Sequence, residues 1–80
     1  MTVEILSPEK KVFSGEADII TCPGLDGSFQ LKNNHAPLIS ALKKGALIVK
    51  SEKGENTFSI SGGFVEMLNN KVSVLVESAE

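Results

Sequence analysis

Few residues in this 80-residue chain could do acid–base or nucleophilic chemistry at neutral pH. His35 is the only histidine, and histidine is the side chain whose unperturbed pKa lies near neutrality. Nucleophilic catalysis needs a nucleophile, a base and an orienting group, so any such site would depend on His35. A histidine that hydrogen-bonds neighbouring backbone and shapes the turn in NNHAPL is the simpler interpretation. We therefore expect no catalytic residue.

The other candidate groups are a single cysteine and pairs of carboxylates and lysines. Cys22 cannot form an internal disulfide, and with one histidine it cannot supply the three or four ligands of a zinc site. We expect it to be a small buried residue in a reducing compartment. Glu16 and Asp18 are two apart on a predicted strand and so share a face, but a solvated surface explains them and the lysine pair at 43–44. We expect no metal and no cofactor.

The composition disfavours nucleic-acid binding and a membrane-spanning segment. The formal net charge is −2 and every basic residue is a lysine, so the bidentate guanidinium group that suits phosphate and guanine is missing. Trp and Tyr are absent, which leaves four Phe to stack on bases. No run of about 18 apolar residues occurs, and the start MTVEILSPEKK lacks the features of a signal peptide. We expect a soluble chain that stays where it is made.

Turn residues recur at short intervals and divide the chain into segments too short for ordinary helices. This spacing is typical of an all-β sandwich or barrel, and no linker or repeat divides it, so we expect one domain over residues 1–80. The turn pairs are Ser7-Pro8, Ser14-Gly15, Pro23-Gly24, Asp26-Gly27, Asn33-Asn34, Lys44-Gly45, Lys53-Gly54, Gly62-Gly63 and Asn69-Asn70. The segment APLISALKK has some helical spacing, but Pro37 and Gly45 limit it to about two turns, so we expect strand or extended chain.

Several segments alternate apolar and polar residues, as half-buried strands do. The side chains that this alternation places in the core are Val3, Ile5, Phe58, Ile60, Val72, Val74 and Val76. Residues 46–49 and 19–22 are largely apolar on both faces, which predicts strands inside a sandwich or under a partner. Gly62-Gly63 lies between two such strands and permits backbone angles closed to other residues, so we expect a tight turn or a bulge there.

The segment from Pro23 to Leu42 is poor in charge. Only Asp26 and Lys32 are charged among its residues, although charged residues make up 22% of the chain. Interface centres are depleted of charge and retain apolar and small polar residues, so a surface segment of this kind indicates a binding face. A segment that crosses the core of a small sandwich would have the same composition, and the sequence leaves both interpretations open.

Two long segments of the sequence resemble a known family. FSGEADIITCPGLDGSFQLKNNHAPLISALKKGAL and FSISGGFVEMLNNKVSVLVESAE are similar to the amino-terminal β-sandwich of the epsilon subunit of F-type ATP synthase, called delta in mitochondria. The resemblance covers nearly all of the chain. Its ordered signatures are Phe13-Ser14-Gly15, Pro23-Gly24 with Gly27, His35-Ala36-Pro37-Leu38, Lys44-Gly45, and Ser61-Gly62-Gly63 with Glu66.

The resemblance implies a flattened sandwich of about ten short strands. It also implies a non-catalytic subunit of the central stalk, or rotor. One surface would pack on the gamma subunit and one end would sit on the loops of the membrane c-ring, so that ion translocation is coupled to ATP synthesis. Together with the short amino terminus, it implies a peripheral position on the cytoplasmic face of a bacterial inner membrane.

The resemblance also assigns positions to individual residues. Those expected at or near the ring end are Gly27, Ser28, Phe29, Asn33, Asn34 and His35. Residues 36–40 are expected to continue toward the gamma contact, with Ala36, Pro37, Leu38 and Ser40 as the interface residues.

The chain departs from the family pattern in two ways. Many members continue into a helical hairpin that inhibits hydrolysis and in some cases binds ATP, whereas this chain stops at Glu80, so we expect neither property here. Where many members have Pro-Gly or another turn pair before the histidine, this chain has Asn33-Asn34, and because Asn tolerates the left-handed region the turn is expected to survive. The competing hypotheses are a ligand-binding sandwich with a pocket around His35 and a barrel that binds single-stranded nucleic acid.

Overall fold

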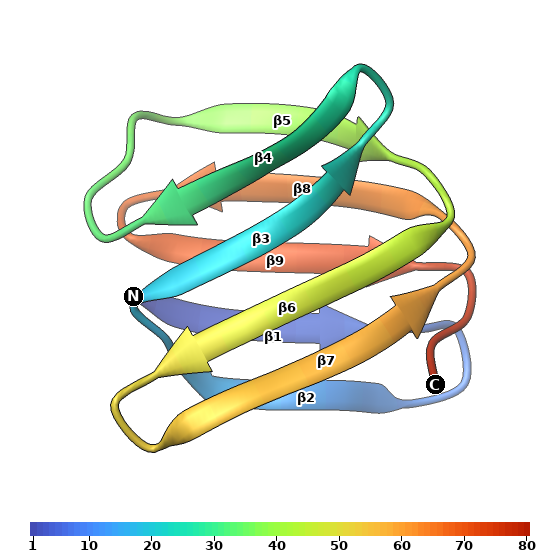
Figure 1. The fold of residues 1–80 in the computed structure, drawn as a ribbon, viewed down its shortest axis with the longest axis horizontal. Coiled ribbons are helices and arrows are strands. Elements are labelled where there is room, and N and C mark those ends of the chain that lie inside the picture. Colours follow the sequence, from blue (N-terminus) through green and yellow to red (C-terminus); the bar gives the residue numbers. More distant parts are fainter.

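Nine strands in two packed layers make up the computed structural model, which describes all residues from 1 to 80 (Figure 1). This confirms the all-β prediction, with nine strands where the resemblance implied about ten. The strands are β1 (Thr2–Leu6), β2 (Lys11–Glu16), β3 (Ile19–Gly24), β4 (Gly27–Lys32), β5 (Leu38–Leu42), β6 (Gly45–Ser51), β7 (Gly54–Ile60), β8 (Gly63–Leu68) and β9 (Lys71–Val76). The structure contains no helix of the length and hydropathy needed to cross a bilayer.

One continuous series of hydrogen-bonded strands forms both layers, and the strands of one layer run at an angle to those of the other (Figure 1). One layer runs β2-β1-β9-β8-β5, with β1 and β9 parallel and the other pairs antiparallel. The other layer runs β4-β3-β6-β7 and crosses the first at an angle, as Figure 1 shows. A single residue pair, Gly24 with Leu42, joins β3 to β5 and so connects the layers.

The core lies between the layers and is built from the inward residue of each alternating pair. Val3, Ile5, Ile60 and the three valines of β9 are buried as predicted, while Phe58 is half-buried and packs against the same cluster. Each such aliphatic side chain contributes roughly 1.5–3 kcal/mol when it leaves water. In APLISALKK, residues Leu38–Leu42 form β5 and no residue is helical, which confirms the expectation of strand or extended chain.

Three asparagines and four glycines have positive φ angles at or beside the turns. Asn69 and Asn70 have φ of 51° and 58° in the two-residue turn between β8 and β9, where both central residues of a type I′ turn need φ above zero. Asn34 has φ of 62°, so the expected turn before the histidine is present. Gly63 has φ of 153°, and a Cβ there would lie 2.0 Å from the carbonyl oxygen of Leu75.

The sandwich has two edges, one covered by packed side chains and the end of the chain, and one left open. At one edge, β2 and β7 approach, and the rings of Phe13 and Phe58 pack edge to face with centroids 5.8 Å apart. The final residues also cover β7, since the Ser59 and Glu80 backbones exchange hydrogen bonds of 2.9 and 3.0 Å. At the other edge, β4 pairs only with β3 and β5 only with β8 and Gly24, so no ladder joins β4 to β5. We call this the open edge (Figure 1).

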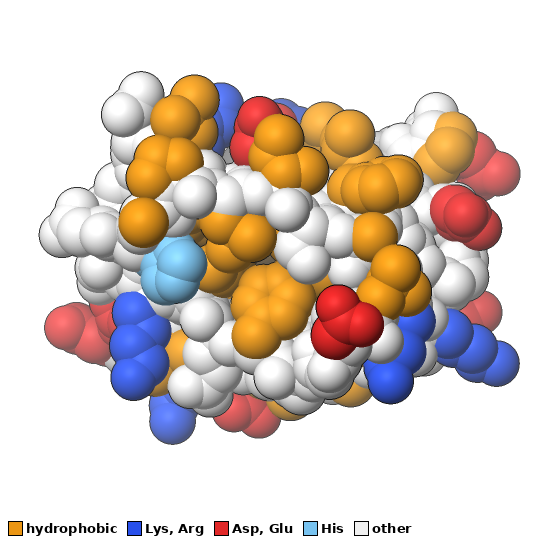
Figure 2. Space-filling model, turned by 90° about the horizontal axis from the view of Figure 1, so that it is seen from above, with side chains coloured by type: hydrophobic (Ala, Val, Ile, Leu, Met, Phe, Trp, Pro, Cys, Tyr) orange, Lys and Arg blue, Asp and Glu red, His pale blue; other side chains and the backbone are white.

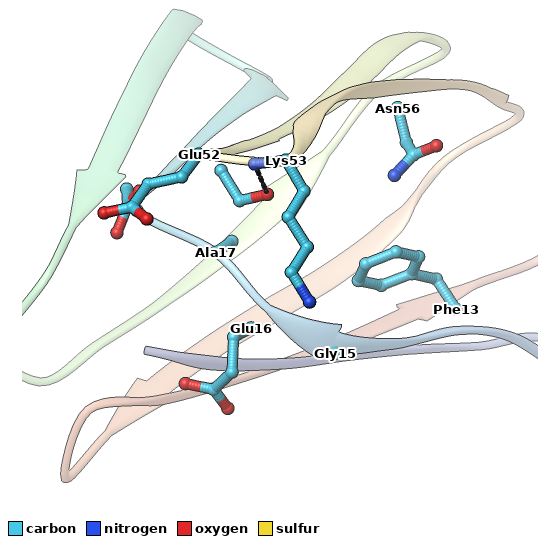
Figure 3. Close-up of a pocket in the computed structure, with 9 residues that line it drawn as sticks. Phe13, Gly15, Glu16, Ala17, Glu52, Lys53 and Asn56 are labelled. Carbon is cyan, nitrogen blue, oxygen red and sulfur yellow. Dashed lines mark hydrogen bonds between the residues drawn. The ribbon is translucent and has the colours of Figure 1, made fainter.

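The expectation that Glu16 and Asp18 share a strand is wrong. Glu16 ends β2, Ala17 is buried, and Asp18 lies in the connection to β3. Both acidic residues line a depression of about 470 Å³ beside the β6–β7 turn. Figure 3 shows the side chain of Lys53 reaching into this depression between Glu16 and Phe13. The Lys53 backbone N–H donates to Ser51 Oγ at 3.3 Å, which fixes the turn that carries the lysine.

Candidate partner surfaces

His35 orders a turn and does not line a pocket. Its side chain is exposed, its Nδ1 lies 2.8 Å from the carbonyl oxygen of Ala36, and its backbone N–H donates to the Lys32 carbonyl at 3.2 Å. The three depressions of the structure are lined by other residues. The interpretation of His35 as a turn-shaping histidine is confirmed, and the alternative of a ligand pocket around it has no support.

The loop that presents His35 is tied to the amino terminus and to one other turn. Asn33 Oδ1 accepts a hydrogen bond from the amino-terminal ammonium of Met1. The Asn34 backbone N–H donates to Asn70 Oδ1 at 2.7 Å, which links the loop to the β8–β9 turn. Because hydrogen bonds that involve a charged group are stronger than neutral ones, the ammonium contact fixes the loop most firmly. The loop is therefore an ordered surface despite its exposure.

The residues expected at the ring end do not gather at one end of the domain. Gly27 and Ser28 begin β4, whereas Asn33 to His35 follow its last residue. Gly27 and Asn33 are six positions apart along an extended chain, which corresponds to roughly 20 Å. The structure therefore spreads the residues along the whole of β4, with Phe29 half-buried between them and packed against the core.

The residues expected toward the gamma contact point in different directions. Ala36 and Pro37 are exposed in the connection before β5. Leu38 and Ser40 are half-buried and pair with the buried Met67 and Val65, so they face the interior, where Leu38 packs against the core. Ile39, between them, faces outward with 73% of its surface exposed.

The charge-poor segment from Pro23 to Leu42 lies mainly at the surface. Its buried residues are Pro23, Gly24, Leu31 and Leu42, and most of the others are exposed. The segment forms β4, the loop after it and β5, which are the two sides of the open edge. Figure 2 views the molecule from that side, with the only histidine in pale blue and hydrophobic side chains across the middle. The segment therefore does not cross the core, and its role as a binding face stays a prediction.

A second apolar surface lies on the outer side of the β5-β8-β9-β1 layer. Cross-strand pairs place four apolar side chains in one row, in the order Ala41, Phe64, Leu75 and Leu6. Phe64 and Leu75 are 59% and 55% exposed, and Ile39 lies in the adjacent row. These five residues border a depression of about 370 Å³ or lie beside it. We call them the apolar face.

The outer side of the other layer is more polar. Its cross-strand rows run from Gln30 through Thr21 and Ile48 to Thr57, and from Lys32 through Ile19 and Lys50 to Glu55. The side chains at the ends of both rows are polar or charged and exposed, whereas Ile19 and Ile48 are half-buried. Contiguous exposed apolar surface marks an interaction site more strongly than scattered apolar residues, so the two layers differ as docking surfaces.

The sequence interpretation missed most of the apolar face. Leu75 occupies the outward phase of β9, where the alternation predicts a polar residue such as Ser73. In β8, Phe64 and Leu68 are likewise apolar residues at exposed positions where the alternation predicts polar ones, and Glu66 lies between them. Large apolar residues at strand positions where the alternation predicts polar ones could have indicated this face from the sequence.

The one cysteine takes no part in either surface. Cys22 is fully buried in the core, and burial raises the pKa of its thiol from 9.0 to about 12. Since the thiolate is the nucleophilic form, the thiol is inert at neutral pH. The prediction of a small buried residue is confirmed.

The fold and its surfaces define a class of protein: a small β-sandwich with an apolar outer face and a charge-poor open edge. The family described as "ATP synthase, Delta/Epsilon chain, beta-sandwich domain" matches residues 1–80. The ATP synthase epsilon chain of Chlorobaculum tepidum is 46% identical over 77 residues, which cover 95% of this chain and 88% of that protein. The epsilon chain of Salinibacter ruber is 39% identical over 89 residues, and the match covers this whole chain and 60% of that protein.

Solved structures show the same fold at lower identity. A cryo-EM structure of the Euglena gracilis mitochondrial ATP synthase, OSCP/F1/c-ring, contains a chain that superposes with a TM-score of 0.90 at 22% identity, over 98% of this chain and 51% of that one. A chain in the central stalk/c-ring structure of the Tetrahymena thermophila enzyme gives 0.85 at 19% identity, over 99% of this chain and 64% of that one. The chain belongs to the family of ATP synthase delta/epsilon β-sandwich domains.

Proposed function

We propose that the chain is a non-catalytic subunit of the central stalk of an F-type ATP synthase. It links the gamma subunit to the c-ring, so that rotation driven by ion translocation reaches the catalytic head. Membership of the delta/epsilon family over residues 1–80 carries the proposal. The protein then works as a peripheral component at the cytoplasmic face of a bacterial inner membrane, as its similarity to bacterial epsilon chains supports.

The apolar face is the surface that we assign to gamma. Ile39, Phe64 and Leu75 expose more than half of their surface on one side of a rigid sheet. Burial of apolar area stabilises a complex by roughly 25 cal/mol per Å², and interface centres are apolar with a polar rim. Ala36 and Pro37 lead into β5 at the border of this face, while Leu38 and Ser40 support it from inside.

The open edge is the surface that we assign to the c-ring loops. It includes Gly27, Ser28 and Phe29 of β4 and the loop residues Asn33, Asn34 and His35. The outward backbone groups of β4 have no partner strand, and an unpaired edge of this kind accepts hydrogen bonds from another chain. Because β5 borders both the open edge and the apolar face, one strand connects the two contacts.

Binding to gamma tests the proposal. We would mix the chain with recombinant gamma subunit from the same organism and measure co-elution by size-exclusion chromatography. We expect a stoichiometric complex that Ile39→Asp abolishes and that Thr57→Asp, on the polar outer side of β7, leaves intact. Failure of the wild-type chain to co-elute, or equal effects of the two variants, would contradict the proposal.

A further inference from the structure

Glu66 stands among apolar side chains on the apolar face. Its cross-strand neighbours are Ile39 on β5 and Ser73 on β9. Along β8 it lies between the exposed side chains of Phe64 and Leu68. With Ile39 and Phe64 it lines the depression of about 370 Å³. The carboxylate is therefore inside the area that a partner on this face would cover.

The chain itself provides no counter-charge for Glu66. The two salt bridges of the structure join Lys11 to Glu4 at 3.5 Å and the Met1 ammonium to Glu16 at 3.9 Å. Lys71 lies in the next row of the face and makes no salt bridge with it. No hydrogen bond from another side chain reaches Glu66 either.

A carboxylate that loses its water needs a positive charge or hydrogen-bond donors in return. A partner that covered Ile39 and Phe64 with apolar groups alone would leave the carboxylate of Glu66 dehydrated and unpaired, which opposes binding. A basic group at that point would instead offset the dehydration and fix the orientation of the two proteins, since opposite charges across an interface set its register.

We propose that the gamma surface which covers the apolar face presents a lysine or arginine side chain opposite Glu66. This inference rests on the proposed function, because it takes gamma as the occupant. Glu66 then selects the orientation of the complex, while Ile39, Phe64 and Leu75 supply the apolar contact. The charge of the Glu4 and Lys11 pair is already neutralised within the chain, so Glu66 is the group that distinguishes a basic partner surface from a neutral one.

The test measures the dissociation constant for gamma by isothermal titration calorimetry. Glu66→Gln keeps the size of the side chain and removes its charge, and Glu55→Gln on β7 is the matched control on the opposite layer. We expect Glu66→Gln to weaken binding by about tenfold or more and Glu55→Gln by less than about twofold. Both variants should keep the wild-type melting temperature, because each side chain is exposed.

A double-mutant cycle then identifies the partner residue. Each exposed Lys and Arg of gamma is changed to Gln alone and together with Glu66→Gln. We expect one basic residue whose loss weakens binding to the wild-type chain but adds nothing to Glu66→Gln.

The possible failures are distinguishable. If the wild-type chain does not bind gamma, the proposed function fails, and this inference fails with it. If the wild-type chain binds and Phe64→Asp abolishes binding, but Glu66→Gln binds like wild type or no gamma residue couples to it, only the basic partner is wrong. Glu66 would then serve the free chain alone, for example by opposing self-association through the apolar face.

Discussion

Cys22 is an example of a residue whose chemistry is decided by where its strand places it. Its side chain faces the core from β3, and burial raises the pKa of its thiol to about 12. We predict that the native protein reacts with a disulfide reagent such as DTNB at pH 8 at least about 100-fold more slowly than the urea-unfolded chain. The absorbance of the released thiolate measures both rates. Equal rates would mean that the thiol is accessible in the native state.

The same residue makes stability depend on pH in the alkaline range. The folded-state pKa of Cys22 is raised, so its neutral thiol favours the fold fully below the unfolded pKa of 9.0, and this contribution is lost as pH rises toward about 12. We predict that from pH 8 to pH 10 the wild-type free energy of unfolding falls by roughly 1 kcal/mol more than that of Cys22→Ala. Urea titrations at the two pH values measure this, and parallel losses would contradict it.

At this scale the sequence predicted some roles and missed others. The turn-shaping role of His35 was predictable because a lone histidine in the turn sequence NNHAPL has backbone groups within reach. The direction of Leu38 was not, because Leu38, Ile39, Ala41 and Leu42 put apolar side chains on both faces of β5. Pairing with Met67 and Val65 decides which of them face inward, and that pairing is not encoded locally.

Neighbouring residues of β5 point to opposite sides, one toward the core and one toward the surface that we propose binds gamma. Leu38 packs against the core, while Ile39 is exposed. We predict that Leu38→Asp lowers the free energy of unfolding by about 3 kcal/mol, since it places a carboxylate among apolar groups, and that Ile39→Asp changes it by less than about 0.5 kcal/mol. Urea denaturation followed by circular dichroism would show the difference. Similar losses for both variants would mean that the assigned directions are wrong.

The start of β8 depends on the absence of a side chain at Gly63. A Cβ there would lie 2.0 Å from the Leu75 carbonyl oxygen, and φ is 153°. We predict that Gly63→Ala lowers the free energy of unfolding by about 3 kcal/mol or more, because backbone of β8 or β9 must move. Gly54→Ala is the control: its φ is 137° but its surroundings are open, so it suffers only the backbone strain of about 1–2 kcal/mol. Equal melting temperatures of the two variants would contradict this account.

Local patterns predicted most of the elements but not how they are arranged. Turn pairs and alternation located the strands, since both depend on neighbouring residues. The parallel pairing of β1 with β9 joins the two ends of the chain, and no local signal indicates it. The family resemblance, not a local pattern, places Gly27 and Asn33 together at the ring end, and in the structure they lie at opposite ends of β4.

The whole molecule presents two surfaces on a framework of cross-paired strands. The apolar face and the open edge meet along β5, and β5 is bonded to both layers through β8 and Gly24. Two packed layers with a shared core resist shear because the interior is close-packed. A rigid body with two adjoining exposed surfaces fits the proposed role of a subunit that transmits torque between gamma and the ring.

Attachment of gamma to the c-ring is the measurement that tests the central claim most directly. Complexes of the catalytic head and the ring from the same organism would be assembled with the wild-type chain, with Ile39→Asp, and without the chain, then isolated through a tag on gamma. We predict that the c subunit co-purifies in full only with the wild-type chain. Equal recovery of the c subunit without the chain would show that it does not fasten gamma to the ring.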